Sequence, residues 1–272
     1  MAHILLHLIA ASLYAGLALW LRRTLPDNRA PRTIGMLERS VLLIALITHG
    51  LALYTAMFAG GGIQFGFGSA VSMMVWLAIC FYWIETFYAA LHGLHALALP
   101  AGVIATLLSL VFPGQHELIN VGSVAFRAHF IVSMLAYSLF TLAVLHAMLM
   151  TVAERQLHSG RISRAIAQLP PLMTMEALLF RLIGIAFILL TLALGSGVLF
   201  SEELFGEPFR ANHKTVFASA SWLLFGALLF GRSVWGWRGR VALRWTLAGF
   251  IALILAYFGS RFVLEVLLQR VA

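Results

Sequence analysis

Cysteine is almost absent from this 272-residue chain, which contains Cys80 and no other. A disulfide within the chain, a Cys-x-x-Cys redox pair and a zinc site built from thiolates are therefore excluded. Cys80 itself lies inside a long apolar run. Thiol chemistry is thus not expected to be the function of this protein.

Charged residues are also scarce. They make up 10% of the chain, against about a quarter in a typical soluble domain. The hydrophobic fraction of 62% is far too high for a disordered chain, so we infer that lipid covers most of the surface. The net charge of +8 comes from clusters between apolar runs, not from a basic groove with interleaved aromatics. Nucleic acid is therefore not an expected partner.

Long apolar runs dominate instead. A helix needs about 20 such residues to cross the hydrocarbon core of a bilayer. Eight segments qualify, although the fourth is short and bracketed by Pro100 and Pro113: 3–21, 40–59, 69–89, 96–112, 128–152, 178–200, 214–231 and 243–265. No loop is long enough to fold by itself. The sequence therefore predicts an all-α polytopic membrane bundle of eight transmembrane helices, forming a single integral membrane domain over residues 1–272.

The basic residues indicate the orientation of this bundle. Cytoplasmic loops of membrane proteins carry an excess of arginine and lysine. With eight spans, one face of the membrane holds most of the 18 basic residues, and the other face holds only Arg127, Arg210, Lys214, Arg261 and Arg270. Without the fourth span this bias would collapse. We therefore expect eight spans with both termini on the periplasmic side.

Ten histidines occur in the chain, and two of them share a depth. His129 is expected at the outer end of the fifth segment and His213 at the outer end of the seventh. Neutral imidazole is an axial ligand of haem iron, and histidines on facing helices can clamp one porphyrin. His129 and His213 are therefore candidate axial ligands of haem iron. The alternative stays open that they lie at span ends because their polar atoms reach water there.

The surroundings of these histidines fit the same hypothesis. Haem propionates are anionic, and three of the five basic residues on the outer face are neighbours in sequence: Arg127 beside His129, and Arg210 and Lys214 beside His213. These residues complete the candidate cofactor-binding set. Flat apolar walls for a porphyrin are available from Trp76, Phe126, Phe130, Phe217 and Trp222.

Other polar residues give weaker indications. His49 lies near the middle of the second segment, where an ionisable side chain is by default a functional hypothesis. A hydrogen bond to a neighbouring helix would also satisfy its ring, and we favour that explanation. The acidic residues form no chain across the membrane, as a cation pathway would need. No arrangement of serine, cysteine, histidine and acid has a catalytic spacing, so no catalytic residue is assigned.

Several motifs occur in a specific order near the C-terminus. These are Gly-Ser-Gly-Val at 195–198, Arg232, Gly-Trp-Arg-Gly at 236–239 and Tyr-Phe-Gly at 257–259; a further run, Ser-Met-Leu-Ala-Tyr at 133–137, follows His129. Together they resemble the CcsA/CcmC/HemX-type cytochrome c assembly membrane proteins, in particular the small HemX-like and YpjD-like inner-membrane members. In this resemblance His129 falls at the position of a periplasmic haem-ligand histidine.

The chain departs from that family in two places. Haem-handling members carry a tryptophan-rich periplasmic segment, the WWD motif, before the seventh span, whereas residues 201–212 contain no tryptophan. Members also commonly place a second periplasmic histidine near the last span, and residues 262–270 contain none. We therefore expect haem transport, chaperoning or regulation of haem supply, and not the formation of thioether bonds to cytochrome c.

The resemblance thus implies a bacterial inner-membrane protein that holds haem b near the periplasmic face. Besides the lipid bilayer, its expected partners are other cytochrome c biogenesis proteins or membrane transport proteins. The alternative is a haem-free accessory or regulatory subunit of a membrane transport system, for instance one for divalent cations. The missing tryptophans favour this alternative, and His129 in its expected context favours the first hypothesis.

Overall fold

The computed structural model describes residues 2–24, 34–58, 63–89, 92–113, 121–160, 169–201, 212–259 and 261–263, with the isolated residues 163 and 166. Its architecture is all-helical, as predicted. The helices are α1 (Ala2–Arg23), α2 (Met36–Met57), α3 (Phe67–Glu85), α4 (His95–Val111), α5 (Val124–Ser159), α7 (Leu172–Leu199), α9 (His213–Trp235) and α10 (Arg240–Ile254). A 3-10 turn, η1 (His92–Leu94), precedes α4, and a π-helical turn, η2 (Leu255–Gly259), continues α10.

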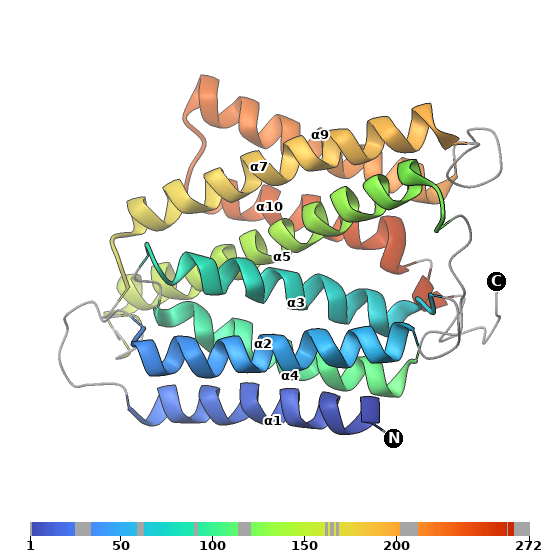
Figure 1. Cartoon of the computed structure of the whole chain (residues 1–272). Coiled ribbons are helices and arrows are strands. Elements are labelled where there is room, and N and C mark those ends of the chain that lie inside the picture. Colours follow the sequence, from blue (N-terminus) through green and yellow to red (C-terminus); the bar gives the residue numbers. More distant parts are fainter. Residues whose placement is uncertain are drawn as a thin grey trace.

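Each of the eight expected segments overlaps one of these α-helices, and the last, 243–265, continues past α10 into η2. Within the described ranges, seven helices are long and apolar enough to cross a membrane. The remaining one, α4, is also apolar but has 17 residues and contains Pro100. It packs against both α1 and α3 along the bundle (Figure 1). The structure therefore describes a polytopic membrane bundle, and the number of helices that cross remains a prediction.

Local sequence explains where the long helices begin and end. Ser123 caps the N-terminus of α5 by accepting a hydrogen bond from the Phe126 amide, and Asn212 caps α9 by accepting one from the Thr215 amide, 3.1 Å away. Gly160 and Gly236 end α5 and α9 in the left-handed conformation, with φ of 68° and 64°. The N-terminal caps set where α5 and α9 begin, and therefore how far His129 and His213 lie from the starts of their helices.

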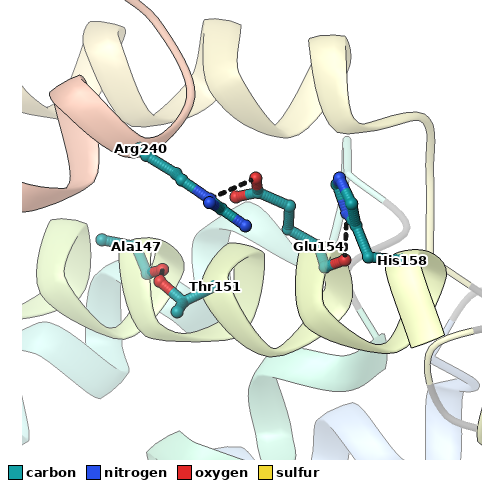
Figure 2. Close-up of polar contacts among 5 residues, drawn as sticks. All are labelled: Ala147, Thr151, Glu154, His158 and Arg240. Carbon is teal, nitrogen blue, oxygen red and sulfur yellow. Dashed lines mark hydrogen bonds and ion pairs between the residues drawn. The ribbon is translucent and has the colours of Figure 1, made fainter.

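The helices lie side by side and alternate in direction (Figure 1). The end at which α1, α3, α5 and α9 begin, on the right in Figure 1, is called the His129 end; the end at which α10 begins is called the Arg240 end. At the Arg240 end, the Arg240 guanidinium donates to the Glu154 carboxylate at 3.0 Å, which ties α10 to α5 (Figure 2). Both partners are partly exposed, so this tie lies at the surface.

Helix α5 divides the bundle into two groups. Helices α1 to α4, the first group, pack on one another, and helices α7, α9 and α10 form the second group. α5 contacts α3 in the first group, and α7 and α10 in the second. Its Phe140 ring stacks on Phe225 of α9 with centroids 3.9 Å apart, and its Tyr137 hydroxyl donates to the Leu253 carbonyl at 3.0 Å. The core is thus continuous through α5.

Candidate functional site

His129 lies in the second turn of α5, on the side that faces α7. Its ring is partly buried, and Nδ1 lies 2.8 Å from the Ser196 hydroxyl oxygen. Ser196 in turn donates its single hydroxyl proton to the Ala193 carbonyl, 3.0 Å away. With the hydroxyl proton directed at the Ala193 carbonyl, Nδ1–H of the histidine donates to the Ser196 oxygen. In that arrangement Nε2 carries the lone pair.

This tautomer is the one that a metal-binding histidine uses when Nε2 is the ligand atom. Such a histidine usually donates its other ring N–H to a fixed partner, which sets the ring orientation. In the present structure the Ser133 hydroxyl, one turn along α5, lies 3.5 Å from Nε2, which is a long hydrogen bond. The donor set at His129 therefore fits an axial haem ligand.

Ser196 and Gly197 of α7 lie beside the His129 ring. A Cβ atom at Gly197 would lie 3.5 Å from His129 Cε1, in ordinary van der Waals contact, and Gly195 has open space around it. Ser196 stands between these two glycines, and it is the residue of the Gly-Ser-Gly motif that bonds to the His129 ring. Sequence reasoning used this motif only for its family likeness and missed the role of Ser196. A lone hydroxyl between glycines in an apolar span was the available signal.

His213 is the first residue of α9, and its side chain is exposed. The stacked pair Phe140–Phe225 allows its depth to be compared with that of His129. His129 precedes Phe140 by 11 residues and His213 precedes Phe225 by 12, which correspond to about 16 and 18 Å along parallel helices. Eleven residues make about three full turns, whereas twelve add a further third of a turn. By this count the two histidines lie at a similar depth. His129 points in about the same direction from α5 as Phe140, whereas His213 is rotated by about a third of a turn around α9 relative to Phe225.

Arg127, an expected propionate partner, is turned away from His129. Arg127 is two positions away on α5, which rotates its side chain by about 200° around the helix. Its Nε and Nη2 donate to the Val121 and Gly122 carbonyls, each at 2.9 Å. Lys214 is exposed at the start of α9, and it is close enough to Arg261 for the two positive charges to repel each other. Arg210 lies outside the described residues.

The expected aromatic walls separate into two places. Trp76, Phe126 and Phe130 line a cavity between α2, α3 and the start of α5. Trp222 instead stacks on Phe187 of α7, with centroids 5.5 Å apart, and donates to the Thr191 hydroxyl at 2.9 Å. Phe217 is exposed on α9. His129 therefore faces α7 on one side of α5, and the aromatic cavity lies on another side.

His49 is fully buried and hydrogen-bonded on both ring nitrogens, which confirms the explanation favoured above. The Tyr14 hydroxyl of α1 lies 3.3 Å from Nδ1, and the Ser72 hydroxyl of α3 lies 2.8 Å from Nε2. His7, 1% exposed, is held by a 2.7 Å bond from Nδ1 to the His3 carbonyl. A polar network thus joins α1, α2 and α3 inside the first group.

A buried histidine–carboxylate pair links α5 to α3, and sequence reasoning did not find it. His146 Nε2 of α5 lies 2.9 Å from a Glu85 carboxylate oxygen of α3, and the two side chains are 0% and 3% exposed. The residues are 61 positions apart in the chain, so no local pattern connects them. Glu176, near the start of α7, pairs with Arg232 of α9 at 2.6 Å. Within the described ranges, no three histidine, cysteine or acidic side chains form a metal-binding group.

The fold and these sites define a polytopic helical membrane protein with buried histidines. Residues 34–268 match the family described as cytochrome C assembly protein, and the chain belongs to that family. It is 28% identical to inner membrane protein YpjD of Escherichia coli K12 over 269 residues, covering 97% of this chain and 98% of that protein. A 28.8 kDa protein of Azospirillum brasilense is 37% identical over 142 residues, about half of each chain (52%).

A more distant likeness extends to a cytochrome c biogenesis protein. CcsA of Gloeobacter violaceus is 30% identical over 92 residues, which is 34% of this chain and 27% of that protein. These relationships confirm the family expected from the sequence motifs and a multi-pass location in the bacterial inner membrane. They do not favour the alternative of an accessory subunit for membrane transport.

Proposed function

We propose that this protein binds haem b through His129 and handles haem for cytochrome c assembly. The observation that carries the proposal is the hydrogen bond from His129 Nδ1–H to Ser196 at 2.8 Å. It holds the ring in one tautomer and directs the Nε2 lone pair for coordination. Membership of the cytochrome C assembly family supplies the biological context. Bound haem would supply an iron with axial positions for imidazole.

The remaining residues of the candidate site have separate roles. His213 is the proposed second axial ligand, because it stands at the depth of His129 and its exposed side chain is able to change direction. Lys214 and Arg210, beside His213 in sequence, are the proposed partners of the propionates. Arg127 lies at the His129 end of the bundle, where it contributes a positive charge at the rim of the membrane. Ser196 is a positioning residue, since it acts through the His129 ring.

We propose that eight helices cross the membrane and that the His129 end faces the periplasm. The distribution of basic residues supports this orientation. Among the described residues, the His129 end holds Arg127, Lys214 and Arg261. The Arg240 end holds Arg22, Arg23, Arg39, Arg155, Arg181, Arg232, Arg238, Arg240 and Arg244. Cysteine accessibility at introduced sites on the two ends would test the orientation.

Absorption spectroscopy of the purified protein tests the haem proposal. The wild type, purified in detergent from haem-replete cells, is expected to show a Soret band and reduced haem b bands. His129→Ala is expected to lose haem, and His213→Ala is expected to shift the spectrum or lower haem content. His158→Ala, which alters an exposed histidine at the Arg240 end, is the matched control. A wild type without haem would refute the proposal.

A further inference from the structure

The cavity on the far side of α5 from α7 has a volume of about 310 Å³. Gly50, Tyr54 and Met57 of α2 line one side, and Trp76 of α3 and Phe130 of α5 line others. Gly50 and Met57 are seven residues apart, so the cavity extends about 10 Å along the helix axis. It is a long apolar slot parallel to the bundle.

The mouth of this cavity faces the surroundings of the bundle. Its rim residues Tyr54, Phe58 and Ile131 are 60%, 48% and 56% exposed. They belong to or adjoin α2 and α5, which are long and apolar enough to cross a membrane. Exposed apolar side chains on such helices contact acyl chains and not water. An apolar slot open to that medium is filled by hydrocarbon, because an empty one forfeits dispersion contacts.

Among the described residues that line the cavity, Arg127 is the only charged one, and it lies at the rim. The guanidinium is fixed by the Val121 and Gly122 carbonyls of the turn that precedes α5, and Val121 also lines the cavity. These bonds use Nε and Nη2, so Nη1 keeps its two protons for a further acceptor. No described acidic residue is paired with Arg127. A fixed guanidinium at the rim that pairs with no described acid is complementary to an anion.

We propose that this cavity is a binding site for an anionic phospholipid. One acyl chain lies in the slot between α2, α3 and α5, and the phosphate accepts hydrogen bonds from Arg127. The position of the arginine matches this occupant, since Arg127 lies in the first turn of α5, at the depth where lipid head groups begin. This site is separate from His129 and goes beyond the proposed haem-handling function.

Native mass spectrometry of the detergent-purified full chain tests the proposal. Dioleoylphosphatidylglycerol and dioleoylphosphatidylcholine would be titrated separately, because they share acyl chains and differ in charge. One basic side chain near a membrane surface contributes about 1 kcal/mol toward an anionic lipid, so the first bound equivalent should prefer the glycerol lipid by about fivefold. Arg127→Gln should abolish that preference. Ile131→Trp, which fills the mouth, should weaken binding of both lipids.

Two variants serve as matched controls. Arg22→Gln removes an exposed arginine at the Arg240 end, and Ile188→Trp adds the same bulk on α7 at a side chain that is 61% exposed and does not line the cavity. Both should bind lipid as the wild type does. Equal affinity for the two lipids in the wild type, or an unchanged first equivalent in Ile131→Trp, would overturn the proposal. Loss of haem from Ile131→Trp with lipid binding unaltered would assign the cavity to haem instead.

Discussion

The two groups of helices on either side of α5 bury different kinds of side chain. The first group encloses ionisable residues: His49 is hydrogen-bonded to Tyr14 and Ser72, His7 is buried beside its own helix backbone, and Glu85 is paired to His146 of α5. In the second group, the buried hydroxyls of Ser221 and Thr246 bond to backbone carbonyls, and aromatic rings fill the space against glycines.

This difference shows what the family motifs report. The Gly-Trp-Arg-Gly turn follows α9, and Trp237 of that turn packs on Gly231 and lies against Trp245 with centroids 5.1 Å apart. Gly249 lets Phe225 approach α10 in the same way. These motif residues have packing roles. The motif that touches a candidate ligand is Gly-Ser-Gly on α7, which meets His129 where α5 and the second group join.

The largest effect is expected from breaking the buried pair that links the first group to α5. His146→Ala leaves the Glu85 carboxyl buried without its partner, which should cost about 3–5 kcal/mol of unfolding free energy. Denaturant-driven unfolding in mixed micelles measures this loss. Replacing both residues by leucine should cost less than the single change, because no polar group is then left unpaired. A single variant as stable as wild type would contradict this account.

The polar network around His49 should give the next effect. His49→Leu leaves the Tyr14 and Ser72 hydroxyls without their shared partner inside the first group, at an expected cost of about 1–3 kcal/mol. The same unfolding measurement applies. Adding Tyr14→Phe and Ser72→Ala should recover part of the loss. Further destabilisation by those two changes would show that packing, and not hydrogen bonding, holds these helices.

Close packing in the second group gives a prediction of similar or smaller size. A Cβ at Gly249 would lie 2.9 Å from the Phe225 ring, so Gly249→Ala should destabilise by about 1–3 kcal/mol through overpacking. Gly184→Ala is the control, because no heavy atom lies within 4 Å of its added Cβ. It should be neutral or slightly stabilising. Equal effects of the two alanines would remove close packing as the explanation.

The smallest effect is expected at the surface tie of the Arg240 end. Arg240 and Glu154 are 65% and 22% exposed, and such pairs contribute at most about 1 kcal/mol. Arg240→Gln should therefore leave the unfolding midpoint nearly unchanged (Figure 2). A loss comparable to that of His146→Ala would mean that exposed and buried pairs hold the two groups equally.

The helices were predictable from the sequence because lipid demands long apolar runs, and each expected segment overlaps a helix. The partners of the histidines were not predictable, because Ser196 meets His129 only when α7 packs on α5, 67 positions along the chain. Arg127 and His129 illustrate a second cause. The two residues are close in sequence, yet two steps along a helix turn a side chain to nearly the opposite side.

The most direct test of the account is chemical rescue at His129. His129→Gly, purified from haem-replete cells, should lack the Soret band of the wild type, and haemin added together with imidazole should restore it, whereas haemin alone should not. His158→Gly with the same imidazole should behave as wild type. A Soret band in His129→Gly that equals that of the wild type without imidazole would contradict the claim that His129 ligates haem.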